Sequence, residues 1–428
     1  MNNISTEMFS LMEKLFPICR SITGDGVRET LDIINNYIPL NIQEINTGTK
    51  VFDWEIPQEW NVKDAYIKDE NGKKIIDFKK SNLHLVSYSI PIKKRFQIDE
   101  LRKHLFTIPE QPEVIPYVTS YYKKDWGFCL SHNQLLDLKS EYYDVFIDSS
   151  FTNGSLTYAD LLIKGNSDKE IIFSTNICHP SLANNELSGP VLCTFLAKWL
   201  IDNKKNNYSY RFVFIPETIG AISYISKNMK VLKRNVIGGY TVTCVGDPGN
   251  FSYLMTPNDN ALVDRITTHV LFHSGRKYNI YPFSKRGSDE RQYNYPGVDL
   301  NIGSLMKSKY HDYPEYHTSA DNLQFVKKDE IFDSLEMYKN CIKVFENNLT
   351  YSNTSTCEPQ LGRRGLYPQH STKSTAKETE KIMDVLAYSN GKNDLLFIAE
   401  KIGSNINELV PIVKKLFKEK LLKETING

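Results

Sequence analysis

The stretch IIFSTNICHPSLANNELSGPVLCTFLAKWL, residues 171–200, decides the fold of this chain. It opens with an apolar run of the kind that forms a buried strand, and a helix is expected to begin after Ser188-Gly189-Pro190. Between them lies a polar loop that carries His179, Asn185 and Glu186. Because open α/β sheets bind ligands beyond the carboxyl ends of their strands, this loop is the first candidate for a functional site.

Segments with the pattern of strands alternate with segments with the pattern of helices on both sides of this stretch. Strands are expected in LTYADLLIKG, RFVFIP and VIGGYTVTCVG, and helices over residues 189–203, 220–230, 258–274 and 328–347. This alternation predicts an α/β fold with a mixed, largely parallel sheet that helices cover on both faces.

Changes of composition divide the chain into four parts. Residues 1–44 and 141–350 are assigned to the α/β domain. Residues 45–140 alternate apolar and polar residues and contain the turn-like DENGKK and most of the four tryptophans, which predicts an inserted β-rich domain. Residues 351–374 are polar and rich in Ser, Thr, Gly and Pro, as in a linker. Residues 375–428 contain short amphipathic helices with helix–turn–helix spacing.

The overall charge argues against a nucleic-acid or membrane-binding protein. The 52 basic and 51 acidic residues nearly cancel, so no long-range field attracts anionic partners. No run approaches the ~20 apolar residues of a membrane-spanning helix, and the N-terminal segment lacks the pattern of a signal peptide. The seven cysteines are scattered without CxxC pairs, as reduced thiols are. We therefore expect a cytoplasmic protein with no membrane partner.

His179 is a candidate metal ligand, because a neutral imidazole that follows a strand commonly binds zinc. The alternative is a histidine that caps the next helix or hydrogen-bonds the loop. Three consecutive polar side chains, Asn184, Asn185 and Glu186, exceed what a helix cap needs. They favour the functional interpretation.

Three further places carry candidate groups. Glu217 ends the strand RFVFIP and is costly to bury unpaired, so it is either a general base for a metal-bound water or a helix cap. Asp289, Glu290 and Arg291 are consecutive. They either hold the charged ends of a substrate or form a solvated turn. His317, in EYHTSADN, is the second candidate metal ligand.

Four strings, CHPSLANNELSGP, PETIGA, SDERQY and EYHTSADN, occur in this order along the chain. With them the chain resembles the zinc-dependent aminopeptidases of the bacterial leucyl-aminopeptidase and glutaminyl-cyclase fold. In detail it is similar to their aminopeptidase-like relatives that carry an inserted small domain and a C-terminal winged helix. The resemblance spans essentially the whole chain, and it implies a zinc-exopeptidase-like fold with a winged-helix-like domain over residues 375–428.

The resemblance implies roles for some residues, and it also shows that some ligand positions of the family carry residues that do not bind zinc. His179 and His317 fall on the first and last zinc-ligand histidines, and Glu217 falls on the catalytic glutamate. Positions that hold ligand carboxylates in the family carry other residues here, namely Asn185, Thr218 and a residue near Thr243. The usual two-zinc ligand set is therefore incomplete, which favours one zinc ion.

Three interpretations of this site are compatible with the sequence, and we rank them in the following order. Glu186 supplies the third ligand and gives a His179, Glu186 and His317 site for one zinc ion, with an open position for water. Alternatively, Asp289 supplies that ligand. In the third case the site has lost its metal and binds without turnover. One zinc ion is sufficient for hydrolysis, because it lowers the pKa of its bound water to ~7.

We therefore expect a zinc-dependent, aminopeptidase-like hydrolase of amide bonds that acts on a small peptide or an amino-acylated small molecule. Zinc at the three ligands would polarise the carbonyl and its water, and Glu217 would move the proton. The trio Asp289, Glu290 and Arg291, together with Asn185, is assigned to substrate binding. A homo-oligomer is left open.

Two other functions are compatible with the same residues. One is a deacylase or transferase that acts on a sugar or surface-polymer intermediate. The other is a non-catalytic sensor that binds a ligand and signals through the C-terminal domain. Residues 413–424 are rich in lysine, but glutamates dilute them, so packing or protein contact is favoured over nucleic acid. The zinc content of the protein discriminates best between hydrolase and sensor.

Overall fold

The computed structural model describes residues 2–203, 205–366 and 373–425. The chain forms two compact units, the first made of Met1–Asp264 with Lys277–Glu336 and the second of Arg265–Arg276 with Met337–Gly428. Two helices, α7 (Leu262–His273) and α9 (Lys328–Asn347), have residues in both units.

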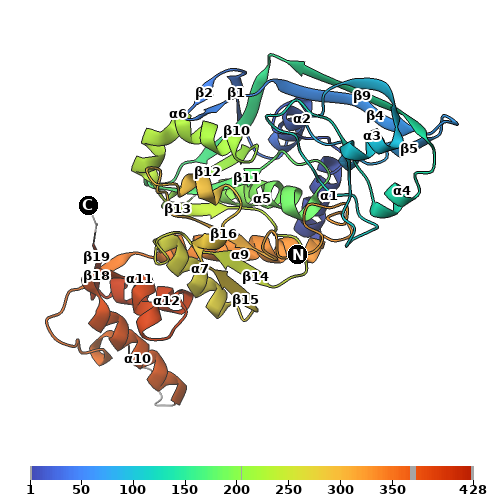
Figure 1. The fold of residues 1–428 in the computed structure, drawn as a ribbon. Helices are drawn as coiled ribbons and strands as arrows, with labels where there is room; N and C mark the ends of the chain where they lie inside the picture. The colour runs from blue at the N-terminus through green and yellow to red at the C-terminus, as the bar shows by residue number, and fades with distance from the viewer. Residues whose placement is uncertain (1, 204, 367–372, 426–428) are drawn as a thin grey trace. The chain divides into compact units, whose positions relative to one another are not determined.

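The first unit is built on an eight-stranded sheet with the order β1-β10-β12-β11-β13-β16-β14-β15 (Figure 1). Its strands are β1 (Asn41–Asn46), β10 (Ser155–Ile163), β11 (Glu170–Asn176), β12 (Ser209–Ile215), β13 (Val236–Thr241), β14 (Phe251–Leu254), β15 (Tyr278–Tyr281) and β16 (Ile302–Met306). The central strands β12, β11, β13 and β16 are parallel. β10 pairs antiparallel with both β1 and β12, and β14 pairs antiparallel with β16 and parallel with β15. The prediction of a mixed, largely parallel α/β sheet is confirmed.

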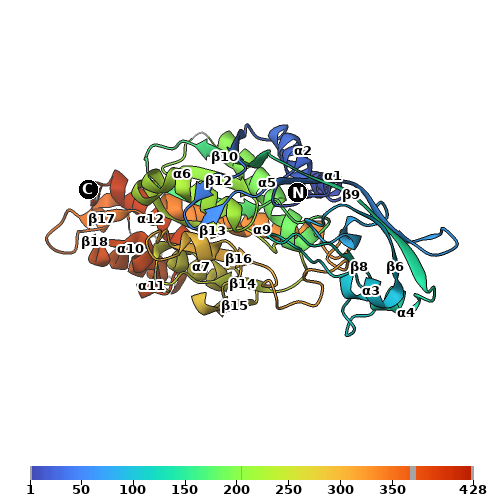
Figure 2. The same cartoon turned by 45° about the horizontal axis from the view of Figure 1, so that its top comes forward.

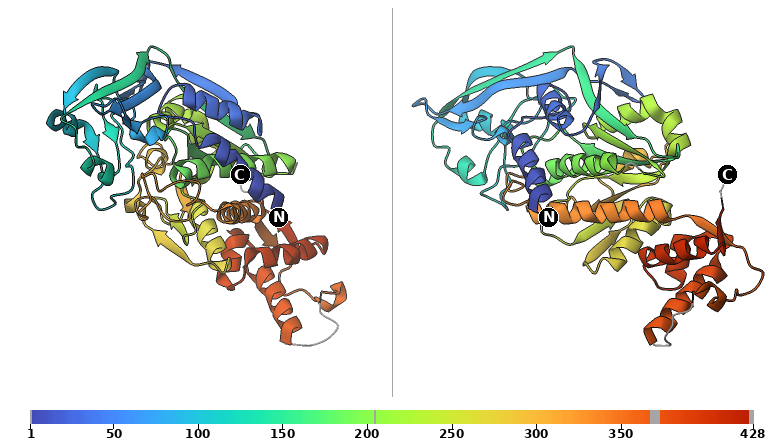
Figure 3. Two further views of the ribbon diagram at one scale, coloured as in Figure 1. Left: turned by 90° about the vertical axis from the view of Figure 1, so that its right-hand side faces the viewer. Right: turned by 180° about the vertical axis from the view of Figure 1, so that it is seen from behind.

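Helices lie against this sheet (Figures 2 and 3). They include α1 (Asn2–Leu15), α2 (Asp25–Asn35), α5 (Ser188–Asp202) and α6 (Ile219–Asn235). α2 packs against β10, α5 against β11, and α6 against β13. Every residue of β11 and β12 is buried, as expected of parallel strands that are covered on both faces. No helix in the described residues is long and apolar enough to cross a bilayer.

A second, antiparallel sheet has the order β5-β4-β9-β6. Its strands are β4 (Glu59–Lys68), β5 (Lys74–Asp77), β6 (Ile92–Gln97) and β9 (Tyr142–Thr152). The DENGKK sequence forms the turn between β4 and β5. β9 lies beyond the predicted inserted domain, 45–140. All of residues 45–140 belong to the first unit. The inserted domain and its boundaries therefore stay a prediction.

Short elements complete the first unit. They are β2 (Lys50–Val51), β3 (Trp54–Glu55), β7 (Leu105–Phe106), β8 (Phe128–Cys129), α3 (Ile98–Leu101), α4 (His132–Leu136), α8 (Glu290–Tyr293), the π-helical turn η3 (Ala183–Leu187) and the 3-10 turns η1 (Asn82–His84), η2 (Arg102–His104) and η4 (Phe283–Lys285).

In the described residues, the second unit contains the helices α10, α11 and α12, parts of α7 and α9, and a three-stranded sheet of order β18-β17-β19. Its elements are β17 (Thr350–Asn353), η5 (Gly362–Arg364), α10 (Lys373–Tyr388), β18 (Asn390–Asp394), α11 (Leu395–Lys401), α12 (Ile406–Lys418) and β19 (Leu422–Glu424). Asp394 caps α11 and Asn405 caps α12 through their side chains. β17 falls within the predicted linker, 351–374, of which residues 367–372 lie outside the described residues.

Candidate active site

The polar segment after β11 forms a helical turn rather than a loop. The chain leaves β11, passes through His179 and enters η3, which continues directly into α5. The carboxylate of Asp321 accepts hydrogen bonds from the backbone N–H groups of Asn184, at 2.6 Å, and Asn185, at 2.9 Å. These bonds satisfy donors that a helix start leaves without an intrahelical partner. As a result Glu186 is 1% exposed and its side chain turns back towards His179.

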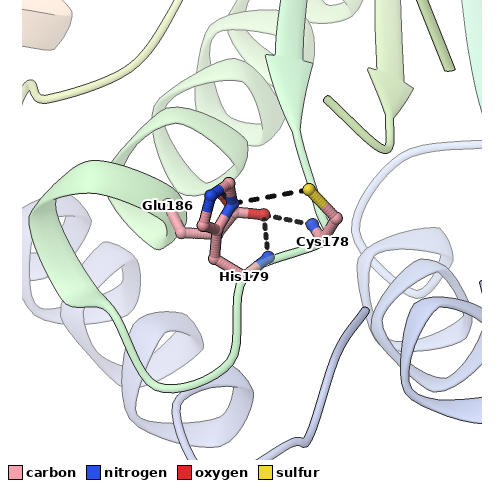
Figure 4. A group of neighbouring side chains, drawn as sticks. All are labelled: Cys178, His179 and Glu186. Carbon is pink, nitrogen blue, oxygen red and sulfur yellow. Dashed lines mark hydrogen bonds and ion pairs between the residues drawn. The ribbon is translucent and has the colours of Figure 1, made fainter. Parts of the chain in front are cut away.

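The Glu186 carboxylate orients the imidazole of His179 (Figure 4). Its Oε2 lies 2.7 Å from Nδ1 of His179. Its Oε1 accepts hydrogen bonds from the backbone N–H of His179, at 2.8 Å, and from that of Cys178. The Sγ of Cys178 lies 3.4 Å from the same Nδ1. With Nδ1 engaged, Nε2 is the ring nitrogen that remains for other partners.

Glu217 lies on the Nε2 side of the ring. It follows β12, and its Oε2 is 3.7 Å from Nε2 of His179. Its Oε1 accepts a hydrogen bond from the Ser288 hydroxyl at 3.1 Å. Burial raises the pKa of Glu217, although the nearby His179 acts against it. Burial, the largest single effect, would lower the pKa of His179, but the charges and hydrogen bonds of Glu186 and Cys178 together outweigh it and raise that pKa well above the usual value.

His317 reaches the same place from far along the sequence. The His179 and His317 ring centroids are 5.2 Å apart, and the ring of Tyr117 lies 4.9 Å from the first and 5.3 Å from the second. The His317 Nε2 is buried and has no hydrogen-bond partner among the described residues. Burial, together with the charge of His179, lowers the pKa of His317 to about 2. This imidazole is therefore neutral at ordinary pH.

Two nitrogen donors of this site suit a zinc ion in kind. Nε2 of His179 and the unpartnered Nε2 of His317 are imidazole ligands of the type that zinc prefers. A buried nitrogen without a partner is costly unless a ligand completes it. Oε1 of Glu186 accepts two backbone hydrogen bonds, whereas Oε2 lies at ion-pair distance from Nδ1 of His179 and has no hydrogen-bond partner among the described residues, so this carboxylate could orient the histidine or bind the ion. Donor atoms of Cys178, His179 and Glu186 also lie within 4.8 Å of one another, so the role of Glu186 as a ligand stays a prediction.

The trio Asp289, Glu290 and Arg291 is not a solvated turn, because both carboxylates are 0% exposed. Asp289 Oδ1 accepts a hydrogen bond from the Thr218 N–H at 2.7 Å, and Arg291 donates to the Thr218 hydroxyl at 2.8 Å. Glu290 Oε1 accepts from the Tyr310 hydroxyl at 2.7 Å. Asp289 Oδ2 has no hydrogen-bond partner among the described residues, and burial raises the pKa of Asp289 well above its usual value. Asp289 and Arg291 thus both bind Thr218, which is the residue next to Glu217. The substrate-binding role of the trio stays a prediction.

Asn185 lies against the end of the neighbouring strand. Its carbonyl oxygen accepts a hydrogen bond from the Thr243 hydroxyl at 2.5 Å, and its side chain is 7% exposed. Two of the three positions at which the resemblance implies a lost ligand carboxylate are therefore in contact with each other. The role of Asn185 in substrate binding stays a prediction.

Two residues that the sequence did not single out also contact the site. Arg20, between α1 and α2, is 0% exposed and donates from Nε to the His179 carbonyl at 3.0 Å and from NH1 to the Leu15 carbonyl at 2.7 Å. Tyr117 contributes its ring from the predicted insertion. Neither carries a local motif, so only spatial proximity identifies it.

The fold is that of an aminopeptidase-like protein with a C-terminal winged helix. A solved zinc aminopeptidase from Bacillus subtilis superimposes with a TM-score of 0.57, over 80% of this chain and 94% of that one. Its identity of 12% shows the fold alone. Residues 9–348 match the family described as "Domain of unknown function (DUF4910)", and residues 349–424 match the winged helix-turn-helix family. The chain belongs to the DUF4910 family.

Two relatives come from Clostridium acetobutylicum. A curated protein named for polysaccharide biosynthesis and an aminopeptidase-like domain is 49% identical over 419 residues, which cover 97% of this chain and 96% of that protein. A crystal structure described as a peptidase is 47% identical, covers 98% of this chain and 96% of its own, and has a TM-score of 0.93. The resemblance inferred from the four sequence strings is confirmed.

Proposed function

We propose that this protein is a metal-dependent hydrolase of amide bonds that uses one zinc ion, with a small peptide or an amino-acylated small molecule as substrate. The observation that carries the proposal is the buried, unpartnered Nε2 of His317 beside the ring of His179, whose own Nε2 faces Glu217. His179 and His317 would hold the ion. Glu186 ranks first as third ligand, and as a ligand it would give up its contact with Nδ1 of His179; Asp289 ranks second, and with it Glu186 would keep orienting the ring. Each of the two carboxylates has a buried oxygen without a hydrogen-bond partner among the described residues.

The protein side chains supply positioning and proton transfer. Glu186 holds Nδ1 of His179, so that Nε2 is presented to the site. Burial raises the pKa of Glu217, which makes this carboxylate a stronger base, and Ser288 fixes one of its oxygens. A bound zinc ion would polarise the substrate carbonyl and acidify a water molecule. Asp289 and Arg291, which keep Oδ2 and Nε without hydrogen-bond partners among the described residues, would hold the charged ends of a substrate.

The test combines metal analysis with activity. Protein purified without chelator should contain about one zinc ion per chain. It should hydrolyse a member of a panel of aminoacyl anilides and N-acyl sugars, and lose that activity on zinc removal. Glu217→Gln should lower turnover about 10²- to 10⁴-fold with zinc content retained, whereas Glu13→Gln, on the exposed face of α1, should change neither. A protein that neither binds zinc nor hydrolyses the panel would instead favour a non-catalytic sensor.

A second candidate is a deacylase of a sugar or surface-polymer intermediate, which would use the same groups on a non-peptide amide. The name of the curated relative, which refers to polysaccharide biosynthesis, favours it. Preference for N-acyl sugars over aminoacyl anilides in the same panel would select this candidate.

A further inference from the structure

A second cavity adjoins the elements that build the site. It has a volume of about 520 Å³, and residues of the β2–β3 hairpin, of α6 and of the segment that begins on α8 line it. Ile222, on its α6 side, donates its backbone N–H to the carbonyl of Thr218, the residue before α6, at 2.9 Å. Gln292, on its α8 side, follows Arg291, which donates to the Thr218 hydroxyl at 2.8 Å. Thr218 and Arg291 therefore link the cavity to Glu217.

Aromatic rings make up much of the exposed lining of this cavity. Ile222, Ile225 and Val298 are 7%, 2% and 9% exposed, so a ligand would meet little of them. Met229, which is half-buried, and Pro296, which is exposed, add apolar surface. Its aromatic residues Phe52, Trp54 and Tyr295 are 61%, 37% and 66% exposed. Asp53 and Gln292 add a carboxylate and an amide among these rings.

The backbone holds one of these rings in a strained conformation. β2 and β3 pair as Val51 with Trp54, so Phe52 and Asp53 are the two residues of the turn. Phe52 has a φ of 53°, in the left-handed region, at the first turn position, where hairpins prefer glycine. Glycine would relieve this strain, and an exposed phenylalanine gains little from burial. Strain kept at an exposed aromatic residue indicates a binding role.

Trp54 is also held in place. The ring of Tyr122 packs edge-on against it, with the two centroids 5.5 Å apart, and Tyr122 itself has a φ of 66°. A ring fixed in this way offers a face to a ligand with little loss of conformational entropy. The cavity therefore has a preorganised aromatic wall.

We propose that this cavity binds a saccharide ring. The C–H face of a pyranose stacks on aromatic faces, and its hydroxyls would hydrogen-bond Asp53, Gln292 and Tyr295, three lining residues with polar side-chain groups. An alkyl chain would find the aliphatic floor covered. This inference rests on the proposed function in one respect, which is that the bound sugar ring carries the amide that Glu217 helps to hydrolyse. The substrate would then be a saccharide that bears an amide.

Binding is tested on the full-length Glu217→Gln protein, so that turnover does not interfere. The probe is the trimer of N-acetylglucosamine, and calorimetry and the change of tryptophan fluorescence measure its affinity. Trp54→Ala and Tyr295→Ala should each weaken binding about tenfold or more, because stacking on an aromatic ring contributes on this scale. Trp54→Phe keeps a ring and should recover most of the affinity. Phe272→Ala removes another exposed aromatic residue, on α7, and should leave binding unchanged.

The outcomes separate the two proposals. If the trimer does not bind, or if Trp54→Ala and Tyr295→Ala bind it like the parent while retaining native circular dichroism, the saccharide assignment is wrong. A dipeptide or an N-hexyl amide that binds with the same dependence on Trp54, in place of the trimer, also overturns it. If the trimer binds in a way that depends on Trp54 but the protein hydrolyses no amide, the saccharide-binding proposal is supported and the hydrolase proposal is wrong. Hydrolysis of anilides without trimer binding does the reverse.

Discussion

Oε2 of Glu186 lies 2.7 Å from Nδ1 of His179, and this contact leaves Nε2 of the ring to face Glu217. The same carboxylate accepts the backbone N–H of His179. One side chain therefore sets both the orientation of the ring and the path of the chain that carries it.

Glu186→Gln should weaken zinc binding about 10- to 100-fold, the usual cost of removing a group that orients a metal ligand. Glutamine keeps one oxygen for the backbone N–H groups, but its amide N–H₂ would then face Nδ1 and disfavour a proton there. Zinc affinity is measured by competition with a chromogenic chelator. The exposed Glu13→Gln variant is the control, and an unchanged affinity in Glu186→Gln would contradict the orienting role.

Tyr117→Ala should lower zinc affinity and turnover about tenfold, because its ring packs on both His179 and His317 and limits their movement. Tyr117→Phe keeps that ring and loses only the hydroxyl contact with Tyr121, at 3.0 Å. We expect it to behave like the unmodified protein. Equal losses in the two variants would show that the hydroxyl, and not the packing, is what matters.

Asp321→Asn should destabilise the protein by about 1–3 kcal/mol, because an amide has a single acceptor oxygen for the N–H groups of Asn184 and Asn185. Burial raises the pKa of Asp321 to about 7, so chemical denaturation is compared at pH 8.5, where the carboxylate is ionised. The exposed Asp168→Asn variant serves as the control. A loss of similar size in that variant would remove the assigned role of Asp321.

The winged-helix unit should lose stability as the pH falls from about 6.5 to about 4. Nε2 of His269 accepts a hydrogen bond from the Ile406 N–H at 3.1 Å, at the start of α12. Burial, followed by the charges of His273 and Arg265, lowers the pKa of His269 to about 4. An unfolded histidine titrates near 6.5. In this window the unfolded chain binds more protons than the folded one, so stability is full above it and is lost as the pH falls.

Hydrogen exchange of the α12 amides at pH 5 and pH 7.5 measures this effect. His269→Gln cannot take up the proton and should show a smaller difference between the two pH values. If its difference equals that of the unmodified protein, other groups control the pH dependence.

The sequence was sufficient for the sheet and for the strand ends, because those depend on local patterns. The apolar run before His179 and the strand before Glu217 both predict groups at the carboxyl end of a parallel sheet, and the structure places them there. The helical turn at Asn184 was expected as a loop, since its stability comes from Asp321, far along the chain. The contacts of Arg20 and Tyr117 with the two histidines depend on tertiary packing, which leaves no periodic signal.

The backbone that carries His317 depends on a segment made much earlier in synthesis. Tyr117 N–H donates to the His317 carbonyl at 2.8 Å, and Pro116 pairs with Thr318 in an isolated antiparallel bridge. On the ribosome, residues 115–117 emerge first and must keep water as their partner until the later segment arrives. The nascent chain would therefore acquire the histidine pair only after residue 317 has emerged, and a chain that stalls before this point would lack half of the proposed metal site.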